Sequence, residues 1–391
     1  MRKKFIRLAL SVFITLFFAT RLAAAEIKVM TFNTWGISDG RDKKERFALI
    51  GKEVGKLGPD LVVFEEVFEE WERAALKSDL VQAGFPADNF RYFPFRSYGT
   101  GIFVASRWPI SESRLEPYIG FTRSSNKESL GRAMTVCRIA APSGDLLFFN
   151  THITPGNLAD LSRSEAMLEF FELARLVYAE SARTGVKRVI VAGDLNADAV
   201  KMIYSIFPAL SGLENAWDAV HPGEPGYTND RRTDPYTIMG IERIDHIFYG
   251  NLTPGPGLAP VKAEVVFDYA YSAPNGKKYF LSDHFGVTAT FEIKDNPKVI
   301  RDAPILQRAD LSSDDKKWLS DNLKRGSRLG ERRDVWTRLG LAVLVDQDRA
   351  ERRDARLVEA ADRLLIELVM PGKFPPAKQD YGELLKWLEK K

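Results

Sequence analysis

The chain has 391 residues but only one cysteine, Cys137, so no intramolecular disulfide can form. Cys137 lies in the alternating apolar stretch Met134–Ile139, and we expect it to be a core residue rather than a nucleophile. The formal net charge is only +3, which gives no bulk electrostatic footprint for nucleic acid. Internal repeats and low-complexity tracts are also lacking. The composition therefore predicts one large globular domain with room for a smaller one.

Long apolar runs are lacking as well, except near the N-terminus. A basic Arg2-Lys3-Lys4, an apolar stretch Leu8–Phe18 and a small-residue Ala23-Ala24-Ala25 follow one another. This order predicts a secretory signal peptide over residues 1–25, with the mature protein beginning near Glu26. We therefore expect a secreted or periplasmic protein. The alternative is an uncleaved N-terminal anchor, although the stretch is short for a membrane span.

Strand-like runs with helical interruptions dominate up to about Ile293. Helical periodicity is confined there to Lys44–Lys56 and Ser164–Tyr178. Many strands with few helices predict an α/β, four-layer αββα sandwich, in which two mostly antiparallel sheets are flanked by helices. The expected strands are Ile27–Thr34, Leu61–Val67, Gly101–Ser106, Ala133–Ile139, Leu146–His152, Val189–Asp194, Ile244–Tyr249, Ala263–Tyr269 and Val287–Ile293.

The composition changes after Asp295-Asn296-Pro297. The rest of the chain is rich in charge and helix formers, and Leu357–Leu368 is one periodic stretch. We expect a catalytic domain over residues 26–295 and a helical C-terminal extension over 296–391. Its charges are mixed, which is typical of a solvated surface, and it carries no catalytic constellation.

Polar clusters stand at the ends of several expected strands, where an apolar strand would not place them. Carboxylates, amides and imidazoles together supply the hard oxygen ligands, phosphate donors and base of a metal-assisted phosphoryl site. Two of the four histidines, His152 and His284, fall in these clusters, and a third, His246, falls in the similar segment Arg243-Ile244-Asp245-His246. The clusters are Phe32-Asn33-Thr34-Trp35, Phe64-Glu65-Glu66-Val67, Asn150-Thr151-His152, Gly193-Asp194-Leu195-Asn196 and Ser282-Asp283-His284.

Two of these clusters suggest chemistry from their residues alone. Asp194 and Asn196 share one strand face if the strand continues through them, and could hold one water or phosphate together. A histidine base needs an acceptor on its second ring nitrogen, and Asp245 and His284 are the candidates for that pair. His246 points away from Asp245 along the strand, and we expect it to be structural.

The order of these motifs, together with Arg243-Ile244-Asp245-His246, resembles the endonuclease/exonuclease/phosphatase superfamily over Ile27–Ile293. Within it, Asn33–Ile37 and Glu65–Phe68 look most like the neutral, magnesium-dependent sphingomyelinases. The resemblance implies Mg²⁺, with Mn²⁺ or another divalent cation as the alternative. It implies metal contacts for Glu66, Asn33 and Asp283. It gives His284, Asp194, Asp245, His152 and Asn196 catalytic roles.

Three positions leave a choice. Neighbouring strand residues face opposite ways, so local pattern cannot choose between Glu65 and Glu66; we expect Glu65 to be exposed at the start of a helix. Arg132 stands where sphingomyelinases commonly carry a lysine. It is either a substrate-binding phosphate contact or an exposed strand-start arginine.

An aromatic segment near the end of the catalytic domain resembles a membrane-touching hairpin. It could equally be a covered sheet edge. The lipid-facing side chains would be Tyr269, Tyr271, Tyr279 and Phe280. A departure from the family is the stretch Ile153–Asn157, which is usually polar or acidic in sphingomyelinases.

The sequence thus predicts an exported Mg²⁺-dependent phosphodiesterase, a sphingomyelinase that releases ceramide and phosphocholine. The expected partner is a phospholipid membrane surface, without specific nucleic acid and without a predicted protein partner. The first alternative is a secreted metal-dependent nuclease of the same fold. The second is an inactive binding protein that uses the C-terminal helices.

Overall fold

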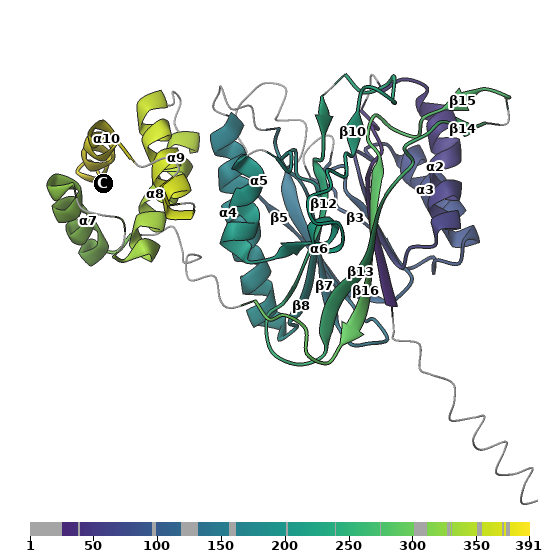
Figure 1. Ribbon diagram of the computed structural model, residues 1–391, viewed down its shortest axis with the longest axis horizontal. Coiled ribbons are helices and arrows are strands. Elements are labelled where there is room, and N and C mark those ends of the chain that lie inside the picture. Colours follow the sequence, from purple (N-terminus) through teal and green to yellow (C-terminus); the bar gives the residue numbers. More distant parts are fainter. Residues whose placement is uncertain are drawn as a thin grey trace, which may run out of the picture.

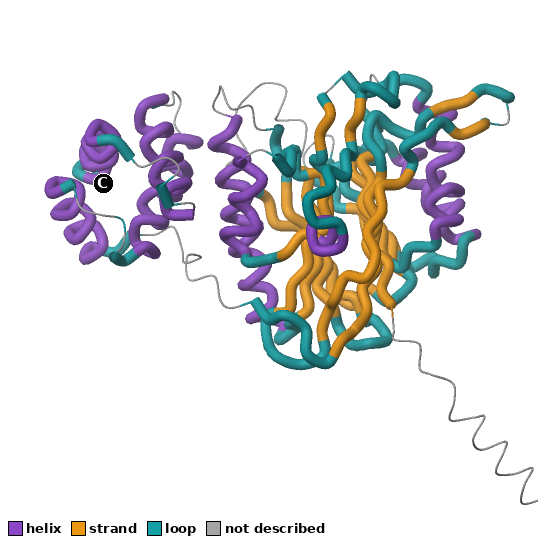
Figure 2. The backbone as a smooth tube through the Cα atoms, in the orientation of Figure 1, coloured by secondary structure: helices purple, strands orange, loops and turns teal. Residues whose placement is uncertain are grey.

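Two six-stranded sheets stacked face to face form the centre of the molecule, with helices on both outer sides (Figures 1 and 2). The computed structural model describes residues 26–37, 40–95, 99–118, 132–155, 162–200, 202–238, 240–273, 275–300, 311–326, 329, 331–349, 354–369, 371–372 and 376–391. The expected signal peptide, residues 1–25, lies outside the described residues. The predicted αββα sandwich with C-terminal helices is confirmed.

The first sheet has the order β13-β16-β1-β2-β4-β3. Its only parallel pair is β1 with β2, joined through helix α2 (Lys43–Leu57), and α3 packs beside α2. The strands are β13 (Gly257–Val266), β16 (Gly286–Lys294), β1 (Glu26–Asn33), β2 (Leu61–Glu65), β4 (Phe103–Ser106) and β3 (Phe90–Tyr92); α3 spans Glu70–Gln82.

The second sheet has the order β5-β6-β7-β8-β12-β9, and its parallel pair is β7 with β8, joined through α4 (Ser162–Thr184). Helices α5 (Met202–Ser211) and α6 (Ala216–Val220) follow β8 and β9. The strands are β5 (Ile110–Pro117), β6 (Ala133–Ile139), β7 (Leu146–His152), β8 (Arg188–Asp194), β12 (Asp245–Asn251) and β9 (Glu214–Asn215).

Apolar side chains point to both faces of the strands, so one face of each sheet packs on the other sheet and the opposite face packs on helices. Val29, Val63 and Phe148 are among the residues that fill the space between the sheets. The opposite faces pack on α2 and α3 in one direction and on α4 and α5 in the other. Cys137 is fully buried in the inter-sheet core, as predicted, and burial raises its pKa to about 12.

The topology brings the polar strand ends to one edge. Parallel β1 and β2 end together, and so do parallel β7 and β8. Antiparallel β12 begins where β8 ends, with Asp245 opposite Asp194. His284 lies two residues before β16, which runs antiparallel to β1. This edge is at the top of Figure 1, where two small hairpins also lie: β10 (Asn229–Asp230) with β11 (Ile241–Glu242), and β14 (Tyr271–Ser272) with β15 (Lys278–Tyr279).

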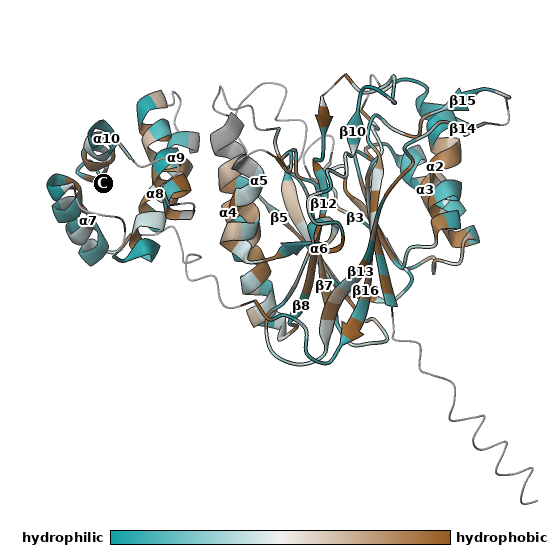
Figure 3. Ribbon diagram, viewed as in Figure 1, coloured by the Kyte–Doolittle hydropathy of each residue, from teal (hydrophilic) through white to brown (hydrophobic). Residues whose placement is uncertain are grey.

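In the described residues after the sandwich, four helices follow: α7 (Ser313–Arg325), α8 (Arg333–Arg349), α9 (Ala355–Val369) and α10 (Lys378–Leu388). Ser312 and Asp315 form a capping box at the start of α7. Helices α8 and α9 pack on α4, and α9 also on α5, so their apolar side chains continue the core of the second sheet. Figure 3 shows hydrophobic positions, in brown, on these helices. Within the described residues, no helix is both long and apolar enough to span a membrane.

Candidate active site

Asn33, the last residue of β1, joins two carboxylates from different sheets. Its Nδ2 donates to Oδ2 of Asp194 at 3.0 Å and to Oε1 of Glu66 at 3.3 Å. Its Oδ1 accepts the N–H of Trp35 at 2.9 Å, which fixes the amide orientation. Both donor bonds reach carboxyl oxygens, and such bonds are stronger than neutral ones when the carboxyl group is ionised. Asn33 therefore ties the end of the first sheet to the end of the second.

The structure distinguishes the adjacent glutamates of β2. Glu66 follows the strand with φ of 59° and turns toward Asn33. The expectation that Glu65 is exposed at a helix start is wrong. Glu65 is the last residue of β2 and is fully buried, with Oε1 accepting a hydrogen bond from Thr31 at 2.8 Å. The helix starts only at Glu70, so the strand continues far enough to bury Glu65 between the sheets.

Asp194 lies between the other residues that the second sheet contributes to the candidate active site. Its Oδ2 lies 3.3 Å from Nε2 of His152, and its Oδ1 accepts the N–H of Asn196 at 2.9 Å. That short turn ends β8 at Asp194 and leaves Asn196 with φ of 48°. The strand therefore does not continue through both residues, so the condition for a shared strand face is not met. Nδ2 of Asn196 instead donates to the carbonyl of Ile153 at 2.9 Å.

Asp245 and His284 are in direct contact. Nδ1 of His284 lies 2.9 Å from Oδ2 of Asp245, and the ring is 7% exposed. Asp194, Asp245 and His284 place one ligand atom each within 4.8 Å of one another. His246 points to the other side of β12, where its ring nitrogens meet Asn215 and the carbonyl of Ala197. Strand alternation thus directs the neighbouring Asp245 and His246 to opposite faces of the sheet.

Arg132 lies beside this site, with its guanidinium directed to the backbone. Its Nη1 donates to the carbonyls of His152 at 2.7 Å and Ile153 at 3.1 Å. The phosphate contact expected of it stays a prediction. Asp283 precedes His284 and accepts a hydrogen bond from Ser282 at 3.3 Å. Its charge helps to raise the pKa of Glu66.

Burial and mutual repulsion perturb the titration of the group. Burial, followed by Asp283, raises the pKa of Glu66 to about 7, and burial with Asp245 raises that of Asp194 to about 6. Burial lowers the pKa of His152 well below its usual value, so the ring is neutral. Burial opposes protonation of His284, but the nearby carboxylates of Asp245, Asp283 and Asp194 together raise that pKa well above its usual range. Such opposed shifts in one cluster are typical of acid–base sites.

The carboxylates fit a divalent cation. Oε2 of Glu66 is buried without a hydrogen-bond partner among the described residues, which is costly for a carboxylate unless a cation approaches it. Asp283 adds a second negative charge nearby, and hard oxygen donors of this kind suit Mg²⁺. The residues that could hold the ion are Glu66 and Asp283. Asn33 holds the Glu66 carboxylate in place.

Sequence reasoning missed two members of this region. Glu65 is expected to be exposed, because nothing in the neighbouring sequence shows that it is buried. Asp234, in the turn between β10 and β11, is also fully buried, and burial followed by the charge of Asp283 raises its pKa to about 7. Its Asp-Pro sequence reads as an ordinary turn, and only the fold brings it toward Asp283 and His284.

Comparison with known proteins bears on the family and the fold. The Endonuclease/Exonuclease/phosphatase family matches residues 30–284. The inositol phosphosphingolipids phospholipase C of Schizosaccharomyces pombe is 25% identical over 327 residues, covering 72% of each chain.

Solved structures share the fold at lower identity. A mutant beta toxin of Staphylococcus aureus with bound magnesium ions superposes with a TM-score of 0.54 at 17% identity, covering 68% of this chain and 99% of the toxin. TDP2 of D. rerio complexed with a single-strand DNA product gives 0.53 at 17% identity, with 68% and 99% covered. At these identities the likeness shows the fold alone.

Proposed function

The chain belongs to the endonuclease/exonuclease/phosphatase family of phosphodiesterases, and we propose that it hydrolyses sphingolipids at a membrane surface, with sphingomyelin as its substrate. The products would be ceramide and phosphocholine. The observation that carries the reaction is the Asp245–His284 pair facing Asp194, with Glu66 and Asn33 beside them. The relative named for inositol phosphosphingolipids supports the lipid class, because both substrates contain a ceramide phosphodiester.

The residues divide the reaction among them. Asp245 fixes the ring of His284 through Nδ1, which leaves Nε2 to accept a proton from the attacking water. Asp194 orients that water. Neutral His152 and the remaining N–H of the Asn196 amide donate to phosphoryl oxygens, where negative charge develops. Mg²⁺ held by Glu66 and Asp283 would supply Lewis-acid polarisation of the phosphate.

The distribution of exposed apolar side chains supports a lipid interface. Among the described residues, six large apolar side chains are exposed, and four of these come from segments at or after strand ends on the site edge. They are Trp71 after β2, Val200 after β8, Ile238 in the β10–β11 turn and Tyr269 after β13. Exposed apolar groups around a catalytic opening are typical of surfaces that meet lipid.

The β14–β15 hairpin gives this rim its aromatic part. Tyr269 is 59% exposed and stacks on Tyr271 with ring centroids 4.5 Å apart. Phe267 connects the pair to Phe32, next to Asn33, so the hairpin is packed against the site strand. Tyr279, however, is buried at 7% exposure, so it presents no surface to lipid. The proposed membrane contact therefore centres on Tyr269 and Tyr271, with half-buried Phe280 at its margin.

We further propose that the protein acts after export, as the basic, apolar and small-residue order at the N-terminus suggests. The protein would then be secreted or periplasmic.

The decisive experiment compares substrates under one set of conditions. Purified protein is incubated with sphingomyelin vesicles, inositol phosphosphingolipid vesicles, and single- and double-stranded DNA, each with Mg²⁺ or EDTA. We expect Mg²⁺-dependent release of phosphocholine, abolished in Glu66→Gln. Turnover of the inositol lipid alone would move the substrate to that headgroup. DNA cleavage without lipid turnover would replace the proposal with a nuclease.

A further inference from the structure

The segment after β7 is held by side chains from three other parts of the chain. Ile153, directly after His152, has its carbonyl bonded by Arg132 and Asn196, while its N–H donates to the carbonyl of Asp194 at 3.0 Å. Thr154 follows and is held by Glu169 of α4. The position of His152 is thus fixed by contacts on the residues that follow it.

Glu169 makes two hydrogen bonds to Thr154. Oε2 of Glu169 accepts the backbone N–H of Thr154 and Oε1 accepts its hydroxyl, both at 2.7 Å. Glu169 is fully buried, and Thr154 is 2% exposed. A two-point contact by a buried carboxylate fixes both the position and the orientation of Thr154, because charge-assisted bonds are short and strong. A contact of the same kind on the exposed surface would restrain Thr154 less, because solvent weakens interactions between exposed charged groups.

We propose that Glu169 is a positioning residue for His152. Thr154 lies two residues beyond His152, and the intervening Ile153 is bonded on both its N–H and its carbonyl. A shift of Thr154 therefore moves the end of β7 and the imidazole relative to Asp194. This inference rests on the phosphodiesterase chemistry proposed for His152, but not on the lipid as substrate.

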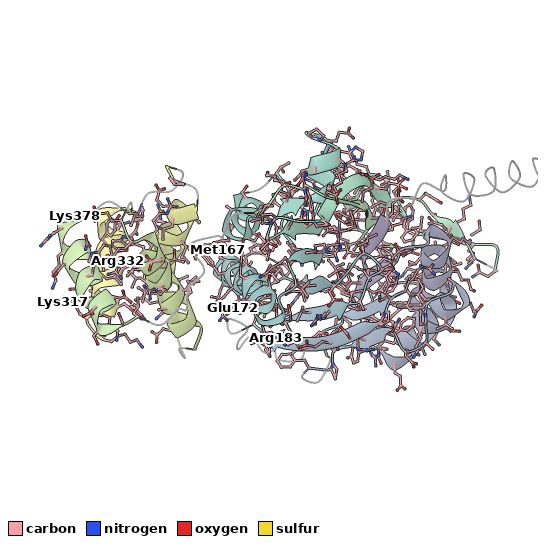
Figure 4. The ribbon with its side chains drawn as sticks, turned by 90° about the horizontal axis from the view of Figure 1, so that it is seen from below. Met167, Glu172, Arg183, Lys317, Arg332 and Lys378 are labelled. Carbon is pink, nitrogen blue, oxygen red and sulfur yellow. The ribbon has the colours of Figure 1, made fainter. Side chains whose placement is uncertain are left out.

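The helix that carries Glu169 is itself braced. Its core-facing side packs on the second sheet, and α8 and α9 contact it from the outside. Figure 4 shows α4, with Met167 and Glu172 labelled, at the border between the sandwich and the C-terminal helices. The C-terminal helices thus stabilise the element from which Glu169 holds the His152 segment.

The test uses the full chain and bis(4-nitrophenyl) phosphate with Mg²⁺, so that it does not depend on a lipid. Glu169→Gln keeps the side-chain shape but replaces one acceptor oxygen with an NH2 group and removes the negative charge, so the bonds to Thr154 lose their charge assistance. We expect kcat to fall by about 10- to 100-fold with little change in KM, because His152 acts on charge in the transition state. Thr154→Val, which removes one of the two bonds, should give a smaller loss of the same kind.

A double-mutant cycle separates positioning from general stability. If Glu169 acts through His152, then Glu169→Gln combined with His152→Ala is no slower than His152→Ala alone. Glu180→Gln is the matched control. Glu180 is a buried glutamate further along α4, bonded to Arg114 and Arg183, and its loss should leave kcat unchanged.

Two results would overturn the proposal: unchanged kcat in both Glu169→Gln and Thr154→Val, or full additivity with His152→Ala. The lipid proposal fails separately. Its failure appears as hydrolysis of bis(4-nitrophenyl) phosphate without turnover of either sphingolipid, and the cycle then still decides the role of Glu169.

Discussion

Nδ1 of His284 lies 2.9 Å from Oδ2 of Asp245, and both side chains are buried. The carboxylate fixes the ring tautomer and raises the pKa of the imidazole against the effect of burial. These two consequences of one contact can be measured separately.

Asp245→Asn should lower kcat by about 10³-fold, because the amide disfavours the working tautomer of His284. It should also move the acid limb of the pH–rate profile to lower pH. His284 must be neutral to accept a proton, and loss of the carboxylate lowers its pKa. His221→Gln, which removes a half-buried imidazole bonded to the Ala263 carbonyl, is the control. A profile that keeps its acid limb in Asp245→Asn would count against this role for the pair.

Metal binding should compete with protonation of Glu66. Its pKa is about 7, so below that pH a proton occupies the oxygen that the cation needs. We expect the apparent affinity for Mg²⁺ to fall by up to about tenfold per pH unit below pH 7. Calorimetric titration at three pH values measures this. Equal affinity at pH 5.5 and pH 8 would show that Glu66 does not bind the ion.

Because its pKa is raised, the ionised form of Glu66 destabilises the metal-free protein. An acid whose folded pKa exceeds its unfolded value stabilises the fold at low pH and loses that contribution as pH rises through the folded pKa. Glu66→Gln should therefore raise the Tm of metal-free protein more at pH 8 than at pH 5. Glu70→Gln, an exposed change at the start of α3, should show no such difference. An equal shift at both pH values would contradict the linkage.

The sequence predicts the centre of this fold better than its edges. Central strands such as Leu146–His152 and Ala133–Ile139 are apolar on both faces, and their bounds match the structure. Edge strand β5 was missed because Ile110–Pro117 carries charge along its length, and β3 because it is only three residues long. Helix α5 was missed because it contains Pro208.

The site shows a similar division. Polar residues after apolar runs identify Asn33, His152 and Asp194 as strand-end groups, and the topology brings them together. Glu65 could not be placed, because two adjacent carboxylates in a strand differ only by which face the fold buries. The contact between Arg132 and Ile153 joins positions on two strands, and no local pattern reports it.

Gly36 should be intolerant of any side chain. A Cβ there would lie 1.9 Å from the backbone oxygen of Glu66, so Gly36→Ala must displace that residue. We expect kcat/KM to fall at least about tenfold, with weaker Mg²⁺ binding, because small displacements at a reacting site are costly. Gly382→Ala in α10 is the control, since a Cβ there meets nothing within 4 Å. Normal Mg²⁺ affinity in Gly36→Ala would show that Glu66 is not held by this contact.

Arg46 should be the main side chain that holds together the two loops of the first sheet that border the site. It is fully buried on α2, and its guanidinium donates to the carbonyls of Thr34 at 2.6 Å, Trp35 at 2.8 Å and Leu281 at 3.1 Å. Thr34 follows Asn33, and Leu281 lies shortly before Asp283. One side chain thus connects both segments expected to approach the metal.

Arg46→Met should lower the free energy of unfolding by about 3 kcal/mol, because it leaves several buried carbonyls without donors. Arg46→Lys should recover little of this loss, since a single ammonium cannot reach the same set of acceptors in a planar fork. Urea unfolding of both variants measures the effect, with exposed Lys44→Met on the same helix as the control. Both variants should also bind Mg²⁺ more weakly. Wild-type stability in Arg46→Lys would show that the charge alone, rather than the forked geometry, holds the two loops together.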